Sequence, residues 1–226
     1  MSVGALLPAD ADGLELERFA PDVVTSSKFV VEAAGCELAI RSCNQAKPCE
    51  ASFEHPDGQP APQITGDNGT LVLRRPRIET RLPFIVRTHR WRADVSLKRD
   101  IIWRLRVEGD SNHAMLSLGD AWLSLIEIVG GSNTAQIILP IPAGPLSVVL
   151  NGGGSTVNLI TQVSVPVAIR ICGAGSRLRV DGLRILGALD QLSWRDSRYM
   201  ESANRIHVRA TGAACAINLI RRDGRP

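Results

Sequence analysis

The residues of this chain best suited to binding an anion lie in VVLNGGGSTVNLI, Val148 to Ile160, where three glycines and a Ser-Thr pair separate two apolar runs. Backbone N–H groups approach a phosphate closely only where side chains are absent, so this stretch is a candidate phosphate loop. It lacks the Gly-Lys-Ser/Thr of a P-loop, and both P-loops and dinucleotide fingerprints require a following helix. The alternating apolar run that follows predicts a strand instead.

The other side chains that could do chemistry do not group into a site. Ser176 in GAGSRL lacks the Gly-x-Ser-x-Gly pattern of a nucleophile elbow. The stretch PADADGLELE contains Asp-x-Asp-Gly without the full EF-hand spacing, which favours a solvated acidic terminus. The histidines form no metal-binding pattern with one another, with a cysteine or with a carboxylate. They are His55, His89, His113 and His207. We therefore predict a protein that is not an enzyme, with no catalytic residue, no cofactor and no metal site.

Composition indicates an ordinary globular protein. The chain has 226 residues, 44% hydrophobic and 22% charged, enough for one large domain or two small ones. Its net charge of +3 is too small to indicate a nucleic-acid binder. No apolar run approaches the roughly 18 residues that a membrane helix needs. The N-terminus lacks the basic and apolar regions of a signal peptide. These features predict a cytoplasmic protein, with a position at the periphery of a membrane complex as a second option.

The five cysteines are odd in number and match no paired CxxC spacing. We predict free thiols for all of them. A bridge between Cys43 and Cys49 is the alternative, but it would require an oxidising compartment. The five are Cys36, Cys43, Cys49, Cys172 and Cys215.

An internal repeat dominates the second half of the chain. The segments RLRVEGDSNHAMLSL, LIEIVGGSNTAQIIL, SVVLNGGGSTVNLI and AIRICGAGSRLRV each consist of an alternating apolar strand, a small or glycine-rich corner and a second alternating strand. Aligning the corners on Ser111, Ser132, Ser155 and Ser176 gives steps of 21, 23 and 21 residues. Further copies centre on Ala213 and, more weakly, on Cys36.

Period-two alternation predicts which side chains fill the interior. On the first strands these are Leu105, Val107, Ile126, Ile128, Val148, Leu150, Ile169 and Ile171. On the second strands they are Leu116, Leu118, Ile137, Leu139, Val157, Leu159, Leu178 and Val180. The residues predicted to face outward are Arg104, Arg106, Glu127, Asn158, Arg170, Arg177 and Arg179.

A unit of this length that buries one face gains a continuous interior only by stacking on its neighbours, which predicts an all-β, single-stack β-solenoid. A β-sandwich is the alternative, since alternation alone does not separate the two folds. Helix should be minimal, with ADGLELERFA near the N-terminus as the best short exception. We divide the chain into an N-terminal segment, 1–26, and a β-solenoid domain, 27–226.

The residues from Trp103 to Ile220 resemble the bacterial toastrack or adhesin-like β-solenoid family, which is also similar to the C-terminal domain of LiaF-like cell-envelope stress proteins. The features that carry the resemblance are the Gly-Gly corners, the LPIPAG connection, the VPVAIRI strand and a Tyr-x-x-x-Ala segment before the last repeat. The resemblance is fainter over Lys28 to Leu73. It implies a structural, adhesive or partner-binding module, and it carries no catalytic residue.

Two segments break the repeat and are the candidate binding regions. The first, 74–106, holds eleven basic residues with Phe84, Trp91 and Trp103 interleaved. Arginine between aromatics suits acidic partners, nucleic-acid backbones and lipid head groups. Ordinary strands with arginine on the solvent face are the simpler interpretation. The second, 186–205, is expected to form a loop or a cap over the end of the stack. The candidate partner-binding residues are Arg87, Arg90, Trp91, Arg92, Trp194, Arg195, Arg198 and Tyr199.

Two functions follow from these observations. The favoured one is a non-enzymatic structural or scaffolding module that binds a protein partner, itself or a larger bacterial assembly. The alternative is a regulatory module that recognises an anionic ligand, nucleic acid or a membrane surface through the arginine-rich segment. Nucleic acid is the disfavoured partner of these, and peripheral membrane contact remains an option.

Overall fold

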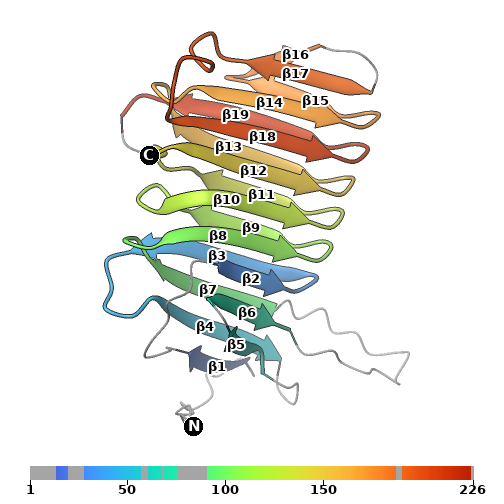
Figure 1. Ribbon diagram of the computed structural model, residues 1–226. Coiled ribbons are helices and arrows are strands. Elements are labelled where there is room, and N and C mark those ends of the chain that lie inside the picture. The colour runs from blue at the N-terminus through green and yellow to red at the C-terminus, as the bar shows by residue number, and fades with distance from the viewer. Residues whose placement is uncertain are drawn as a thin grey trace, which may run out of the picture.

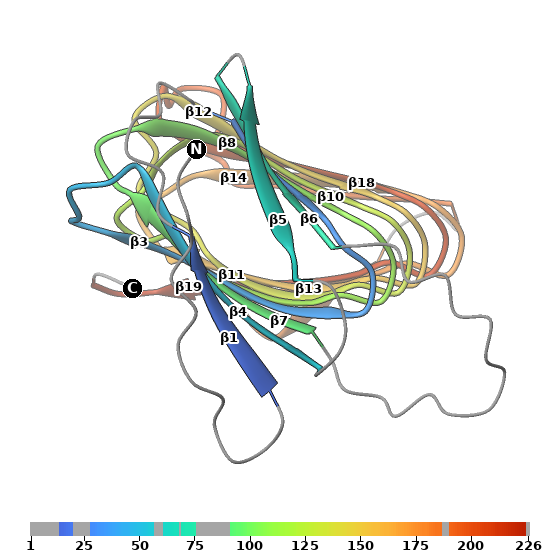
Figure 2. The same ribbon diagram turned by 90° about the horizontal axis from the view of Figure 1, so that it is seen from below.

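The computed structural model describes residues 14–19, 28–56, 61–67, 69–75, 91–186 and 190–224, with the backbone alone for 14–19 and Pro56. These residues form 19 strands in two sheets that face each other across the core, and none of them is helical (Figure 1). Viewed along the stack, the strands superimpose as successive coils around one interior (Figure 2). The predicted β-solenoid is confirmed, and no helix in these residues is long and apolar enough to cross a membrane.

The larger sheet has ten strands. In spatial order they are β1 (Leu14–Phe19), β4 (Cys49–Pro56), β7 (Trp91–Lys98), β3 (Cys36–Cys43), β9 (His113–Ser117), β11 (Thr134–Ile138), β13 (Thr156–Gln162), β19 (Ala216–Arg222), β15 (Arg177–Val180) and β16 (Leu183–Ile185).

The smaller sheet has nine strands. In spatial order they are β17 (Gln191–Arg195), β14 (Val167–Cys172), β18 (Arg205–Thr211), β12 (Pro145–Asn151), β10 (Trp122–Val129), β8 (Ile102–Glu108), β2 (Lys28–Glu32), β6 (Thr70–Arg74) and β5 (Gln63–Asp67).

Strands in the body of each sheet are parallel, and antiparallel pairs occur only at the two ends. β1, β4 and β5 pair antiparallel at one end, and β16 and β17 do so at the other. The alternative of an antiparallel β-sandwich is therefore wrong. The coils that begin with β2, β8, β10, β12, β14 and β18 run from the nine-stranded sheet through a tight corner to the ten-stranded sheet.

The coils do not stack in sequence order. The coil of β18 and β19 lies between that of β12 and β13 and that of β14 and β15. The coil of β2 and β3 likewise lies between that of β6 and β7 and that of β8 and β9. The repeat copy centred on Ala213 is thus inserted into the stack, and β14 with β17 ends the nine-stranded sheet.

The predicted interior is confirmed. Every side chain expected to point inward on the repeated strands is no more than 5% exposed. The residues expected to face outward are half-buried or exposed, as period-two alternation requires. In contrast, the short helix considered for ADGLELERFA is wrong, because Leu14–Phe19 forms β1 and pairs antiparallel with β4.

Glycine is required where one corner passes over the next. Gly130 has φ +118°, and a Cβ there would lie 2.3 Å from the carbonyl oxygen of Gly109. Gly152, one coil further on, has φ +140° and would place a Cβ 2.2 Å from the carbonyl oxygen of Gly130. The glycines of VVLNGGGSTVNLI therefore allow close coil-to-coil approach, as the repeat predicted.

The predicted register of the corners is wrong by one residue beyond Ser132. Ser111 and Ser132 have φ 59° and 57°, and the parallel register, with Thr134 opposite Thr156, aligns them with Gly154. Ser155 instead lies below the corner, in line with two asparagines. The corner residues Ser111, Ser132, Gly154 and Gly175 are consequently 21, 22 and 21 residues apart. The predicted register was wrong because the side chain of Ser155 turns into the stack.

A ladder of polar side chains runs beneath the corners inside the stack. The Cys36 amide donates to Asn112 Oδ1 at 3.1 Å, and the Asn112 amide donates to Asn133 Oδ1 at 2.9 Å. The Asn133 amide donates in turn to Ser155 Oγ at 3.2 Å. Corner amides that lie inside the stack are thereby satisfied, which burial demands of polar groups.

All five cysteines are free thiols, including Cys43 and Cys49. Cys43 Sγ donates a hydrogen bond to Gln45 Oε1 at 2.9 Å. Burial raises the pKa of the Cys36 and Cys49 thiols to about 12, so these two are poor nucleophiles.

Replacing Gly130 with alanine tests the corner contact. We expect a loss of about 3 kcal/mol or more in unfolding free energy, because the new Cβ would overlap the Gly109 carbonyl. Gly175→Ala is the matched control: its φ is +70°, no atom lies within 4 Å of the added Cβ, and Ala214 adopts a similar φ of 57°. That control should lose only about 1 kcal/mol. Urea unfolding followed by circular dichroism measures both, and equal losses would contradict the contact.

Candidate binding surfaces

Three of the seven basic residues that the structure describes in the arginine-rich segment form ion pairs with carboxylates. Arg74 pairs with Glu32 at 2.7 Å across neighbouring strands. Arg106 binds both Glu108, at 3.0 Å, and Glu127, at 2.8 Å. The described part of 74–106 thus supports the simpler interpretation, arginine on the solvent face of strands. Of the predicted binding residues, Arg87 and Arg90 lie outside the described part of the chain.

Trp91 and Arg92 have opposite environments. Trp91 is only 2% exposed, and its ring stacks on His55 with centroids 5.4 Å apart. Arg75 covers the other side of the ring at 5.2 Å from its centroid. Trp91 therefore belongs to the core and offers no surface to a partner. Arg92 is exposed and pairs with Asp94 at 3.2 Å.

The insertion 186–205 contributes a strand as well as a turn. Its residues Gln191–Arg195 form β17, which pairs antiparallel with β14 and extends the nine-stranded sheet by one strand. The chain then turns over the loop side of the stack and enters β18 at Arg205. β17 continues the sheet instead of lying across the end of the stack.

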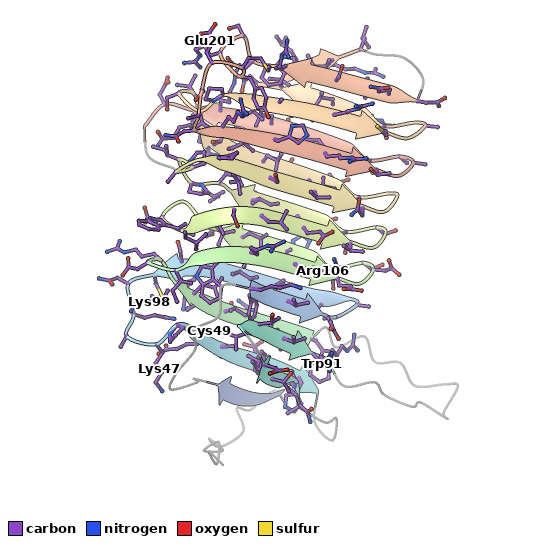
Figure 3. The ribbon with its side chains drawn as sticks, viewed as in Figure 1. Lys47, Cys49, Trp91, Lys98, Arg106 and Glu201 are labelled. Carbon is purple, nitrogen blue, oxygen red and sulfur yellow. The ribbon has the colours of Figure 1, made fainter. Side chains whose placement is uncertain are left out.

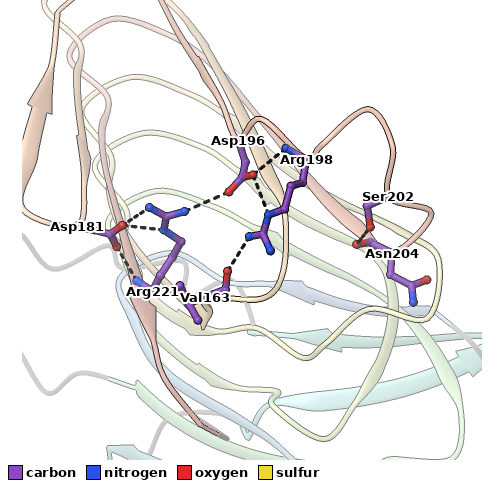
Figure 4. A network of polar contacts seen from close by, with 7 residues as sticks. All are labelled: Val163, Asp181, Asp196, Arg198, Ser202, Asn204 and Arg221. Carbon is purple, nitrogen blue, oxygen red and sulfur yellow. Dashed lines mark hydrogen bonds and ion pairs between the residues drawn. The ribbon is translucent and has the colours of Figure 1, made fainter.

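An arginine-carboxylate network fastens this insertion to the coil beneath it (Figure 4). Arg221 donates to Asp181 Oδ2 at 2.7 Å and to Asp196 Oδ2 at 3.2 Å. Arg198 donates from its main chain to Asp196 Oδ1 at 3.0 Å and from its guanidinium to the Val163 carbonyl at 3.0 Å. Arg198, predicted to contact a partner, instead orders the turn that follows β17.

Hydrogen bonds lower the pKa of both carboxyl groups of the network. Burial alone raises the pKa of Asp181, but the hydrogen bonds and charge of Arg221 outweigh it, so that the pKa lies below its ordinary value. Burial likewise raises the pKa of Asp196, and the Arg198 hydrogen bonds outweigh it, again with a net lowering. Both groups therefore stabilise the fold in their charged form.

The two aromatic residues of the insertion are anchored rather than free. Trp194 is half-buried against the core, and Arg221 lies 5.5 Å from the centroid of its ring. The Tyr199 hydroxyl lies 3.2 Å from His207 Nδ1, and Arg205 lies 5.1 Å from the centroid of the Tyr199 ring. Of the residues predicted here, Arg195 is exposed on the outer face of the sheet.

Large apolar side chains are exposed along one long edge of the stack. We call this the loop edge, because the chain crosses there from the ten-stranded to the nine-stranded sheet through loops rather than glycine corners. Lys98 marks it in Figure 3. Five neighbouring strands of the nine-stranded sheet are involved. β8 and β10 begin with an exposed apolar residue, and β12, β18 and β14 come a few residues after one. Their exposures are Ile102 54%, Trp122 57%, Ile141 55%, Met200 65% and Val163 44%.

A second feature of the nine-stranded sheet is an arginine cluster on its outer face at the C-terminal end. Arg170 on β14 lies directly opposite Arg209 on β18, and Arg195 on β17 lies opposite Ala168 of β14. All three arginines are exposed, and none has a carboxylate partner among the described residues. We call these residues the arginine cluster.

Sequence reasoning missed the loop edge and most of the arginine cluster. Alternation treats Ile102 and Trp122 as members of apolar runs, although both stand at the first position of a strand, where the chain is still turning. Arg170 was expected to face outward, but its neighbour Arg209 lies 39 residues away. Only the spatial order of the coils places the two side by side.

The described residues contain no group of three or more histidine, cysteine or carboxylate side chains that could hold a metal ion. His113 and His207 are exposed on strands of different sheets, and His55 is buried beside Trp91. His89 lies outside the described ranges.

Among solved structures, the chain is similar to a proposed cell adhesion protein from Clostridium sporogenes, with a TM-score of 0.77 and 18% identity over 92% of this chain and 100% of that one. At this identity the likeness shows the fold alone. A proposed adhesin from Bacteroides fragilis aligns over 93% of this chain and 98% of that one, at 8% identity and a TM-score of 0.29, too low to indicate a shared fold. No family model and no curated protein matches the sequence.

Acid should weaken the network around Asp196. Because the folded-state pKa lies below the unfolded value of about 3.9, the stabilisation is present above that pH and is lost as pH falls through the folded-state value. Asp196→Asn should lower the unfolding free energy by about 1–2 kcal/mol at pH 7. The difference from the wild type should shrink as the pH falls below the unfolded value. Denaturant unfolding across this range measures it, with the exposed Asp120→Asn as control; a difference that persists at low pH would refute the charged network.

Proposed function

We propose that this chain is a non-enzymatic binding module, a β-solenoid that docks on a protein partner within a larger bacterial assembly. The observation that carries the proposal is the loop edge. Contiguous exposed apolar surface on an otherwise ordinary globular protein marks interaction sites. Ile102 and Trp122 begin two neighbouring strands, and Ile141, Val163 and Met200 lie in the loops that lead into three further strands of the same sheet, whereas single scattered apolar side chains would need no explanation.

The dimensions of the loop edge suit a protein partner. Neighbouring strands lie about 4.8 Å apart, so the starts of the five strands that these residues begin or lead into span roughly 19 Å. Trp122 and Ile102 are direct register partners and form its most compact part. Aromatic and methionine side chains, as at Trp122 and Met200, are enriched at protein interfaces. On the opposite edge, where the glycine corners lie, the described residues include no exposed large apolar side chain.

The sequence resemblance agrees with this function. We propose that the chain is a toastrack-like relative of the LiaF-like and adhesin-like solenoids, and that it binds rather than catalyses. The similarity to the Clostridium structure, named as a proposed cell adhesion protein, supports the fold on which this rests. We also propose a reducing, cytoplasmic compartment, which the free and buried thiols of Cys36, Cys49 and Cys215 support.

Site-specific photocrosslinking in the native cell tests the proposal. A photoreactive residue at position 122 or 141, on the loop edge, should yield crosslinks to one and the same protein, or to a second copy of this chain. The same residue at position 115 is the matched control, because Met115 is 49% exposed but lies on β9, on the outer face of the other sheet. It should yield none. Equal crosslinking at all three positions, or none at any, would overturn the proposal.

A further inference from the structure

The C-terminal end of the stack presents an open strand. β17 is the last strand of the nine-stranded sheet, and among the described strands it pairs with β14 alone. Such an edge exposes a row of main-chain N–H and C=O groups, which can bond another strand.

The pairing determines which main-chain groups are open. The Asp190 carbonyl accepts from the Gly173 amide at 2.9 Å, and the Asp196 amide donates to the Val167 carbonyl at 2.9 Å. In an antiparallel pair, alternate residues direct both groups to the partner strand. Residues 192 and 194 therefore face β14, while residues 191, 193 and 195 direct their N–H and C=O groups away from the sheet.

The same three residues carry the side chains of the outer face. Gln191, Ser193 and Arg195 are exposed, whereas Leu192 is buried and Trp194 half-buried on the inner side. The open main-chain groups of β17 thus lie at the border of the arginine cluster.

The arginine cluster places like charges next to each other, which is unfavourable on a sheet surface and therefore needs an explanation. Like charges directly opposite each other on neighbouring strands destabilise a sheet, as Arg170 and Arg209 must do. On the same face, Arg106 is placed between two carboxylates. The C-terminal residues 163–226 contain eleven arginines against five carboxylates and no lysine. An anionic partner would remove the repulsion.

Protection against aggregation accounts for only part of the cluster. Charged side chains on an edge strand prevent unwanted pairing, which is sufficient for Arg195. Arg170 and Arg209 lie on the interior strands β14 and β18, where no edge needs protection. Their position next to an open edge favours selective pairing with a strand of opposite charge.

We propose that β17 is the docking edge for an extended acidic segment of a protein partner, which adds to the sheet as a further antiparallel strand. Residues opposite each other in an antiparallel pair share a face. Carboxylates opposite Gln191, Ser193 and Arg195 would therefore lie on the outer face beside the arginine cluster. The alternate residues would point inward at the end of the core, where Leu183, opposite the buried Val180, is 73% exposed, so they should be apolar.

The acidic strand would be bound by main-chain hydrogen bonds to β17 and by the opposite charge of the arginine cluster. Guanidinium groups bind carboxylates in a bidentate manner, which suits a cluster built of arginine alone. The site lies at the end of the stack and does not depend on the loop edge, so it goes beyond the proposed function.

The probe is a labelled, end-capped octapeptide of alternating Glu and Val, titrated into the full chain and followed by fluorescence anisotropy. Two N-methylated versions carry the same charge. Methyl groups on the Glu amides, which face β17 in the antiparallel arrangement, should abolish binding, whereas methyl groups on the Val amides, which face away, should leave it within about twofold. Amide hydrogen exchange on the unmodified complex should show new protection at residues 191, 193 and 195.

Charge reversal supplies the protein-side test. Arg195→Glu and Arg170→Glu should each weaken binding of the alternating peptide by about tenfold or more. Arg104→Glu is the matched control, an exposed arginine on β8 of the same outer face, five strands from β17, and should leave binding unchanged.

Three outcomes would overturn the proposal. The first is absence of binding at millimolar peptide. The second is equal binding of both N-methylated peptides, which would show recognition of charge without strand addition. The third is equally tight binding of a heparin fragment or a short RNA with no protection of the β17 amides, which would assign the cluster to polyanions in general. Each of these leaves the loop-edge proposal untouched, because no loop-edge residue takes part.

Discussion

The structure depends on the close approach of one corner to the next. At Gly130 and Gly152 the chain passes so near the carbonyl of the preceding corner that no side chain fits. This contact fixes the register between coils, since each corner residue can lie over only one residue of its neighbour. The register aligns the columns of interior side chains, and Asn112 and Asn133 satisfy the amides that the tight corners bury. Parallel pairing of the strands follows from the same stacking.

The two long edges of the solenoid differ for this reason. The corners at Gly130 and Gly152 leave no room for a side chain, whereas the loop edge and the outer sheet faces carry large exposed side chains. Arg74 and Arg106 are paired with carboxylates, and so is Arg221 near the C-terminal end, whereas Arg170 and Arg209 have no carboxylate partner among the described residues. The network of Arg221 holds β17 in place beside them.

Alternation was sufficient to predict the interior, because a strand with one buried face reveals that face in its sequence; Leu150 and Val157 are examples. The corner register failed at Ser155, since a small polar residue fits both an exposed corner and an internal ladder. Trp91 was misplaced because clustered arginines suggest a surface, although its own strand buries it. The order of the coils lay beyond prediction, because each repeat is similar enough to stack on any other. The unpaired edge of β17 depends on that order.

The spatial order of the coils is the central claim, because it places β14 and β17 at the end of the sheet. Nuclear Overhauser contacts between backbone protons of neighbouring strands, measured on deuterated, isotope-labelled protein, test it directly. With the coil of β18 and β19 inserted into the stack, we expect contacts of Val149 on β12 with Arg209 on β18, its register partner. Contacts of Val149 with Arg170 on β14 in their place would show that the coils stack in sequence order, and would contradict the position of β18 between β12 and β14.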